Sequence, residues 1–492
     1  MQECYKLTIP GQGPLYMTIN INKKSLNRLI IINLAFVIMI VWCLLTIDRV
    51  YLLTGILCIT LLYLICGAII IDGDDYLFNP LIMFSIMYST TSFSVLYSII
   101  TKFTTSYYLL YSASDKTFVS LLNETLLLFI IGYIFFFGGY LVVRNRNITF
   151  IHDKGNAPFT YNNSVVLGAI YLCFFIALAN FLYVLYNRGG NLLFYMKNVS
   201  VLKYIYGEEQ ISTIGYNFGY MAVYLYAIVC QKKGKYTLGF WLVFAMTFII
   251  KASNGRIFQT IAYAGVVFGL MYVHSYKKNI ESKDRLNRTY LRIGASLGII
   301  AIVYYFLRVI GNIQYSDKGA NTSVLFSEMI NNLFYYLFDK GNTVNTIIVP
   351  KIIDDWEADV GLLLGRSILS SSSQIIHSLN TLFPSIGGLV KNTWFVNTIS
   401  GAIPPTCIGE LIANFGIIGV PIGMLVFGWI CGFIYNKHLR STSTLGNLIY
   451  FQILVGFIFI YPKTDFSNFP LFSILFTAII YKVVIYLSVS KR

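Results

Sequence analysis

The chain has 492 residues, of which 57% are hydrophobic, 16% are aromatic and only 12% are charged. Soluble domains carry about a quarter charged residues, so this composition excludes an ordinary soluble protein. Apolar runs of about 18 or more residues, each long enough to cross a bilayer core of roughly 30 Å, recur along the whole length. We therefore predict an all-α polytopic membrane protein, with one membrane domain over residues 1–492.

The basic residues do not indicate nucleic acid as a partner. The net charge is +15, but the lysines and arginines form small clusters beside apolar runs, which is how membrane topology is encoded. The eight cysteines lie mostly inside apolar runs and form no CxxC pair, which favours packed thiols over metal ligands or disulfides. The sequence has no glycine-rich phosphate loop, so we expect no nucleotide donor and no cofactor.

Twelve membrane spans are predicted. Residues 1–28 are polar and end on basic residues, and the apolar run that follows is too long for a signal peptide, so we treat it as the first span. The predicted spans cover about 29–47, 50–71, 81–100, 122–143, 164–186, 212–230, 237–251, 256–274, 293–310, 408–436, 445–461 and 468–488.

The positive charges predict the orientation of these spans. If segment 1–28 is cytoplasmic, the other strong basic clusters fall on the same side, as the positive-inside rule requires. Both termini are then cytoplasmic, and the predicted outer segments are 101–121, 187–211, 251–256 and 311–407. Segment 311–407 is too long for a turn and too rich in aromatic residues, Leu and Ile for a disordered linker. We expect a large, partly helical periplasmic loop that carries the function.

Residues 365–383 of this loop, GRSILSSSSQIIHSLNTLF, predict an amphipathic helix. At about 100° per residue, Arg366, Ser370, Ser373 and His377 share one face, and Ile and Leu side chains fill the other. Of the four histidines only His377 lies on the predicted outer side, so no histidine cluster for a catalytic metal is expected there. The helix either presents a cation, hydroxyls and an imidazole to a substrate or lies at the interface with its polar face in water.

Other arginines are predicted at the outer membrane boundary. Arg256 ends the turn 252–256, Arg308 lies near the outer end of the ninth span, and Arg188 follows the fifth. A guanidinium grips phosphate oxygens bidentately and stays charged at any working pH. These side chains are either separate interfacial anchors or converge with Arg366 on one phosphate-bearing lipid.

Glu410 lies in the segment 404–432, PPTCIGELIANFGIIGVPIGMLVFGWICG, at the predicted mouth of the tenth span. A carboxylate there is costly unless it is used or paired, so it is either catalytic or a structural partner of a nearby arginine or helix N-terminus. The acidic run DDWEAD at 354–359 predicts a solvated turn or a sugar-facing surface that includes Trp356.

Several motifs resemble a known family. They are FNPLIMFS at 78–85, NGR at 254–256, LLGRSILSS at 363–371 and PPTCIGELIANFGIIGVPIGMLVFG at 404–428. The chain resembles the bacterial O-antigen polymerases of the Wzy type. The resemblance implies a glycosyltransferase of the C-type superfamily in the bacterial inner membrane. Such an enzyme moves a growing glycan from undecaprenyl diphosphate to the non-reducing end of a new lipid-linked repeat unit, on the periplasmic face.

The resemblance also implies roles for single residues. Outer arginines serve the diphosphate in this family and in the related O-antigen ligases; Arg256 matches an arginine that opens a span, while Arg366 and His377 correspond to an arginine and a histidine of the large loop. An arginine–ten residues–glycine pattern fits Arg308, but none begins at Arg188. A chain-length regulator and a flippase are the protein partners that the resemblance implies.

The chemistry agrees with this resemblance. A glycosyl diphosphate already has a good leaving group, so fixed cations and an oriented acceptor hydroxyl suffice, with no metal. His377 and Glu410 are both candidates for the general base. The alternatives are an O-antigen ligase, which uses lipid A–core as acceptor, and a flippase for the lipid-linked unit. The motif at 404–428 favours the polymerase, and transporters usually bury ionisable residues at mid-membrane, where only Lys482 is predicted here.

Overall fold

The computed structural model describes residues 4–8, 18–100, 116–144, 162–187, 210–252, 257–277, 285–296, 343–394 and 403–489. These residues are mostly helical, with one departure from the all-α prediction at the N-terminus. Strand β1 (Cys4–Thr8) pairs antiparallel with β2 (Thr18–Asn22). The sequence of β2, TININ, alternates apolar and polar residues strictly, which is the pattern of a strand.

The first half of the described chain supplies five long helices. Gly73 ends the second of them in a left-handed conformation, with φ 64°, and its N–H donates to Ile69 O. Asn79 precedes the third, and its Oδ1 accepts from Leu81 N at 2.8 Å, as a helix cap does. The five are α1 (Lys23–Thr46), α2 (Leu52–Asp72), α3 (Pro80–Ile100), α4 (Lys116–Val143) and α5 (Asn163–Asn187).

The later helices include several that are too short to cross a bilayer. The long or apolar ones are α7 (Gln210–Lys233), α8 (Leu238–Ala252), α9 (Ile257–Lys277), α15 (Gly419–Arg440), α16 (Thr444–Ile453), which a π-turn extends over Leu454–Ile458, and α17 (Leu471–Val489). The short ones are α12 (Thr343–Asp359), α13 (Ile386–Trp394), α14 (Thr406–Phe415) and the 3₁₀ helices η1 (Arg49–Tyr51), η3 (Arg366–Gln374), η4 (His377–Asn380), η6 (Tyr461–Lys463) and η7 (Phe466–Asn468).

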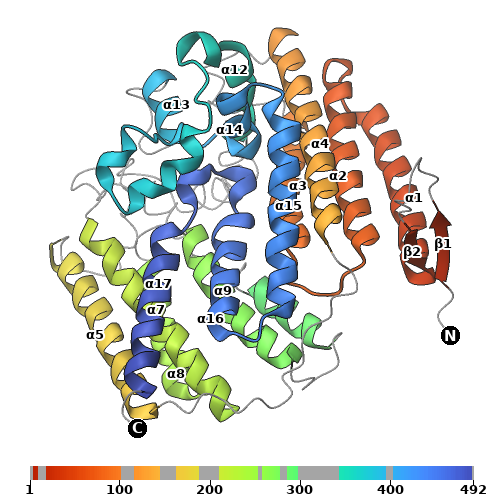
Figure 1. Cartoon of the computed structure of the whole chain (residues 1–492). Helices are drawn as coiled ribbons and strands as arrows, with labels where there is room; N and C mark the ends of the chain where they lie inside the picture. The colour runs from red at the N-terminus through yellow and green to blue at the C-terminus, as the bar shows by residue number, and fades with distance from the viewer. Residues whose placement is uncertain are drawn as a thin grey trace, which may run out of the picture.

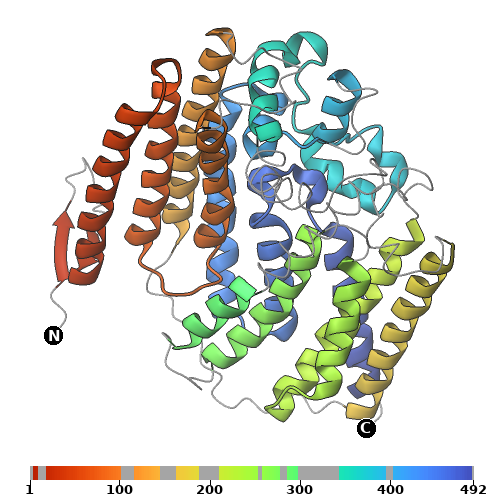
Figure 2. The same cartoon turned by 180° about the vertical axis from the view of Figure 1, so that it is seen from behind.

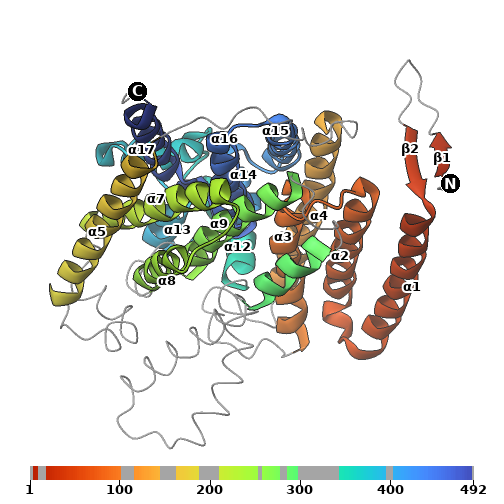
Figure 3. The same cartoon turned by 90° about the horizontal axis from the view of Figure 1, so that it is seen from below.

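The long helices form a bundle with the short ones gathered at one end. Figure 1 shows α12, α13 and α14 above the bundle, and Figure 2 shows them from behind, over α7, α9 and α17. Seen from below in Figure 3, α1 and α5 stand at opposite edges, with α15 and α16 between them. We call the end that holds α12–α14 the site end and the other end the opposite end.

Helix α15 packs closely along α4, and glycine makes this possible. A Cβ on Gly139 would lie 2.0 Å from Leu425 O, and a Cβ on Gly428 would lie 2.0 Å from Phe136 O. No side chain fits at either position, so the two backbones approach each other as small-residue helix pairs do in membranes.

Within the described residues, eight helices are long and apolar enough to cross a membrane, and each overlaps a predicted span. Three further predicted spans, 212–230, 237–251 and 256–274, coincide with α7, α8 and α9. The ninth, 293–310, lies mostly outside the described residues, so twelve spans stay a prediction. The eight are Asn27–Thr46, Arg49–Asp72, Pro80–Ile100, Phe118–Val143, Asn163–Asn187, Gly419–Arg440, Thr444–Lys463 and Phe466–Val489.

The start of the predicted tenth span, 408–436, is wrong. Gly416 adopts φ 68° and ψ −170°, which ends α14 at Phe415, and a separate helix begins at Gly419. Glycine takes such a conformation without steric cost, so the apolar run breaks into two helices where hydropathy predicts one. Glu410 therefore lies on a ten-residue helix before the span.

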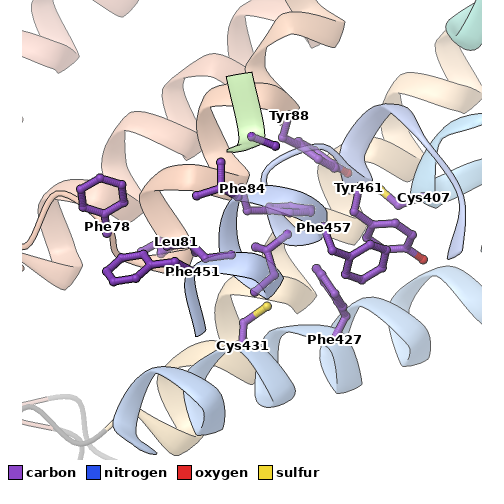
Figure 4. Packing of buried hydrophobic residues seen from close by; sticks show 14 of the residues in the cluster. Phe78, Leu81, Phe84, Tyr88, Cys407, Phe427, Cys431, Phe451, Phe457 and Tyr461 are labelled. Atoms are coloured by element: carbon purple, nitrogen blue, oxygen red, sulfur yellow. The ribbon is translucent and has the colours of Figure 1, made fainter. Parts of the chain in front are cut away.

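A core of aromatic rings connects the bundle to the site end (Figure 4). The rings of Phe84 and Phe136 lie 4.1 Å apart, and Phe84 also contacts Phe427. Phe427 in turn lies 4.9 Å from Tyr461, which Phe457 also contacts at 4.8 Å. This buried column ends at Tyr461, beside Glu410.

Candidate functional site

The site is built around the carboxyl group of Glu410, which is completely buried. Ser367 Oγ donates to its Oε1 at 2.9 Å. The backbone N–H of Phe466 donates to both oxygens, at 3.3 Å and 3.0 Å. The Tyr461 side chain completes the set of neutral partners. Three segments that are distant in sequence, α14, η3 and the turn before α17, thus meet at one carboxyl group.

Asn414, one helical turn after Glu410, extends this network. Its Nδ2 donates to Glu410 O at 2.8 Å and to Ser367 Oγ at 2.7 Å, and its Oδ1 accepts from Gly365 N at 3.0 Å. The side chain is fully buried. Both ends of the amide are therefore satisfied, as buried polar groups require, and the network holds residues 365–367 against α14.

The backbone joins the same two segments. Leu363 N donates to Ala413 O at 3.1 Å, and Leu364 N donates to Asn414 O at 3.0 Å. These carbonyls belong to the last turn of α14 and have no partner within their own helix. Leu364 adopts φ 49°, an unfavourable conformation for a leucine that persists only where its surroundings impose it.

Asp465 is a second buried carboxyl group beside Glu410. Its Oδ2 accepts from Gly387 N in α13 at 3.0 Å, and its Oδ1 accepts from Ser467 N and from Asn468 Nδ2, each at 3.2 Å. Residues 461–468 are therefore hydrogen-bonded to α13, through Asp465, and to α14, through Glu410.

The surroundings of Glu410 favour its protonated form. Burial raises its pKa well above the ordinary value, and the nearby charge of Asp465 raises it further. Hydrogen bonds from Ser367, Phe466 and Tyr461 oppose this shift but do not cancel it.

Arg366 begins η3 and is exposed, with its Nε donating to Leu363 O at 3.3 Å. It directly precedes Ser367, so the Glu410 network fixes the backbone that carries this guanidinium. Of the five predicted site residues, the structure connects these two, Arg366 and Glu410, through Ser367.

The predicted helical face with Arg366, Ser370, Ser373 and His377 is wrong. Residues 366–380 form two 3₁₀ helices, η3 and η4, separated by Ile376 in an extended conformation with φ −125° and ψ 103°. Three residues per turn, in place of 3.6, turn Ser370 inward, where it is buried, and leave Arg366 outside. His377 opens η4 beyond the break.

The remaining predicted site residues either lie outside the described residues or are placed differently by the structure. Arg256, Arg308 and Arg188 lie outside the described residues. Trp356 is not sugar-facing, because it is buried in α12 and its Nε1 donates to Ala413 O at 3.2 Å. Among the described residues no group of three or more His, Cys, Asp or Glu could hold a metal ion.

Sequence reasoning missed the turn between the last two spans. Residues 462–467 are not among the predicted outer segments, yet they supply Phe466 N and Asp465 to the site. One signal was available. Lys463 and Asp465 are two charges within six residues that separate long apolar runs, and such charges at a span boundary usually have partners.

The fold and this network define a multi-pass helical membrane protein with a buried polar cluster at one end of its bundle. The family model for the O-antigen polysaccharide polymerase Wzy matches residues 28–491. The chain therefore belongs to this family, which confirms the resemblance seen in its motifs. It matches no curated protein and no solved structure.

Proposed function

We propose that this protein polymerises O-antigen by joining oligosaccharide repeat units carried on undecaprenyl diphosphate. The observation that carries the proposal is the family match, which extends over nearly the whole chain, from residue 28 to residue 491. The proposed enzyme is a glycosyltransferase of the C-type superfamily. It lies in the bacterial inner membrane, with both termini in the cytoplasm and the site end in the periplasm, and works with a flippase and a chain-length regulator.

The proposed step transfers the growing glycan to a new unit. A hydroxyl oxygen at the non-reducing end of the new unit attacks the anomeric carbon of the growing chain. The bond from that carbon to the diphosphate oxygen breaks, and undecaprenyl diphosphate leaves with the bonding electrons. The proton of the hydroxyl passes to a general base. Negative charge grows on the diphosphate, so fixed cations lower the barrier.

Arg366 is the cation that the described geometry best supports for this role. Its guanidinium is exposed, and the Glu410–Asn414–Ser367 network holds its backbone. A preorganised guanidinium binds phosphate oxygens bidentately at little entropic cost. We assign Arg256 and Arg308 to the same diphosphate on the basis of their predicted outer positions.

Glu410 and His377 receive different roles in this proposal. The Glu410 carboxyl group is buried and already occupied by Ser367 and Phe466, so an acceptor hydroxyl has no open path to it. We assign Glu410 as a positioning residue, which acts through the segment of Arg366. His377 is then the proposed general base.

The experiment that tests the function is a gel of lipopolysaccharide from a strain that lacks the gene, beside the complemented strain. Polymerase activity predicts that the ladder collapses to core plus a single repeat unit. Bare core with polymer accumulating on the lipid carrier would instead indicate a ligase. Bare core with single units trapped on the cytoplasmic face would indicate a flippase, and the assigned residues would then lose their roles.

A further inference from the structure

The segment that carries Arg366 exposes large apolar side chains. Leu364, Leu369, Ile375 and Ile376 are 75%, 53%, 48% and 53% exposed. Four such side chains within thirteen residues make a patch that a protein surface in water rarely shows without a partner. We call residues 364–376 the interfacial segment.

One end of the interfacial segment is fixed where a membrane span begins. Leu364 N donates to Asn414 O. Shortly after Asn414, the apolar side chains of Phe415, Ile417 and Ile418 are exposed, that of Ile418 by 72%. The span Gly419–Arg440 starts directly after them. Exposed apolar side chains thus lie on both sides of this junction, on the interfacial segment and at the start of the span.

The other end is fixed where a second span begins. Gln374 Nε2 donates to Ser467 O at 2.7 Å and to Phe469 O at 2.8 Å, and Phe472 N donates to Gln374 Oε1 at 3.4 Å. These partners lie in the first turns of the span Phe466–Val489. Ile375 and Ile376 follow Gln374 directly, so they lie at the depth where α17 enters the membrane.

We propose that the interfacial segment lies in the lipid–water interface of the bilayer, with its exposed Leu and Ile side chains among the acyl chains. One end is hydrogen-bonded to Asn414, on α14 just before a membrane span, and the other end to the first residues of a second span. A segment held at that depth meets lipid on its free side. The 3₁₀ geometry is compatible with this arrangement, since it buries Ser367, against α14, and Ser370, and leaves Leu369 exposed. The inference rests on the chain spanning a membrane, independently of the proposed polymerase activity.

One consequence concerns Arg366. It lies two residues after Leu364 and three before Leu369 in the same segment, so its guanidinium lies at the depth of lipid phosphate groups. A long cationic side chain at this depth keeps its charge in the headgroup layer while its stem contacts apolar groups. The segment thus presents Arg366 to a phosphate that is attached to a lipid, and it disfavours a freely dissolved one.

The test uses nitroxide labels on single cysteines in the full-length protein in nanodiscs. Cys66 is exposed on α2, and it is replaced by serine together with Cys4 to lower background labelling. Labels are placed by Leu369→Cys and Ile376→Cys. The matched references are Ile479→Cys, on the exposed face of α17, and Ala358→Cys, at an exposed position of α12 between Glu357 and Asp359.

The readout is the ratio of collisions with molecular oxygen, which concentrates among acyl chains, to collisions with a water-soluble nickel chelate. We expect this ratio at positions 369 and 376 to exceed that at position 358 several-fold and to approach that at 479. A ratio equal to that at position 358 would place the segment in water and overturn the proposal. Slow collisions with both reagents would also overturn it, because protein would then cover the patch.

Discussion

Two arginines at the two ends of the bundle show how differently one residue type can be used. At the opposite end, Arg144 follows α4, its Nη2 lies 2.7 Å from Asp74 Oδ2, and its side chain is only 7% exposed. The guanidinium also stacks over the Tyr435 ring, 4.7 Å from the centroid, and Tyr435 OH donates to the same Asp74 oxygen at 2.6 Å. The Arg144 side chain thus joins α4 to α15 and to the turn before α3 inside the protein.

At the site end, Glu410 forms no ion pair with the nearby Arg366. Glu410 accepts hydrogen bonds from the neutral donors Ser367 Oγ and Phe466 N, and among the described residues it pairs with no guanidinium, so Arg366 stays exposed. Burial also favours the neutral form of Glu410 by raising its pKa. The comparison shows that the partner of the carboxyl group decides whether an arginine stabilises the fold or remains available to a ligand.

Arg144→Ala should have the largest effect on stability. It leaves the Asp74 carboxylate partly buried without its cation, and breaking such a pair costs about 3–5 kcal/mol. The measurement is thermal unfolding in detergent or nanodiscs. The control is Arg440→Ala at an exposed position of α15, which should change stability by no more than about 0.5 kcal/mol. Equal melting temperatures for both variants would show that the Arg144 pair contributes nothing.

Arg366→Ala should leave stability unchanged and remove activity. An exposed side chain whose Nε bonds only locally contributes little to folding, so stability should stay within about 0.5 kcal/mol. Chain extension should be abolished, because a diphosphate cation is lost. Arg366→Lys keeps the charge without the bidentate geometry and should restore only part of the activity. Polymer of wild-type length from Arg366→Ala, at normal protein level, would remove this residue from the mechanism.

Ser367→Ala should weaken the connection between Glu410 and Arg366. It removes the donor to Glu410 Oε1 and the acceptor of Asn414 Nδ2, and unsatisfied buried groups cost about 1–3 kcal/mol. Polymer should shorten along with the loss of stability, since Arg366 is then less well positioned. Ser372→Ala is the matched control in the same helix, because Ser372 Oγ donates only locally, to Leu369 O. Indistinguishable unfolding of the two variants would contradict the network.

Glu410 should also make the stability of the protein depend on pH. Its folded-state pKa is raised above the ordinary value of 4.5, so the folded protein holds this proton where the unfolded chain has released it. This contribution to stability is fully present below about pH 4.5 and is lost as the pH rises toward the folded-state pKa, by at most about 1.4 kcal/mol per pH unit. Glu410→Gln should flatten this slope in unfolding measured against pH. Parallel curves for the variant and the wild type would mean that Glu410 titrates normally.

Hydropathy predicted the long helices well, because a bilayer span needs about 20 apolar residues whatever surrounds it. It failed at Gly416, where one glycine breaks an apolar run, and a count of apolar residues does not register that break. The motif at 404–428 correctly indicated the family, since the family model matches residues 28–491. Arg366 and Glu410 were both named from the sequence, but their connection was not.

Composition and motifs were enough to establish the class of protein, the family and most of the membrane helices, since these depend on short stretches of residues. The surroundings of Glu410 depend on the folded chain. Ser367 and Phe466 N lie 43 and 56 residues away from it in sequence, so no local pattern indicates that they bind its carboxyl group. The tertiary structure also decided the 3₁₀ form of residues 366–374. Hydrogen bonds to α14 at one end, and to η7 and the start of α17 at the other, hold that segment, and such contacts override the α-helical period that the sequence alone favours.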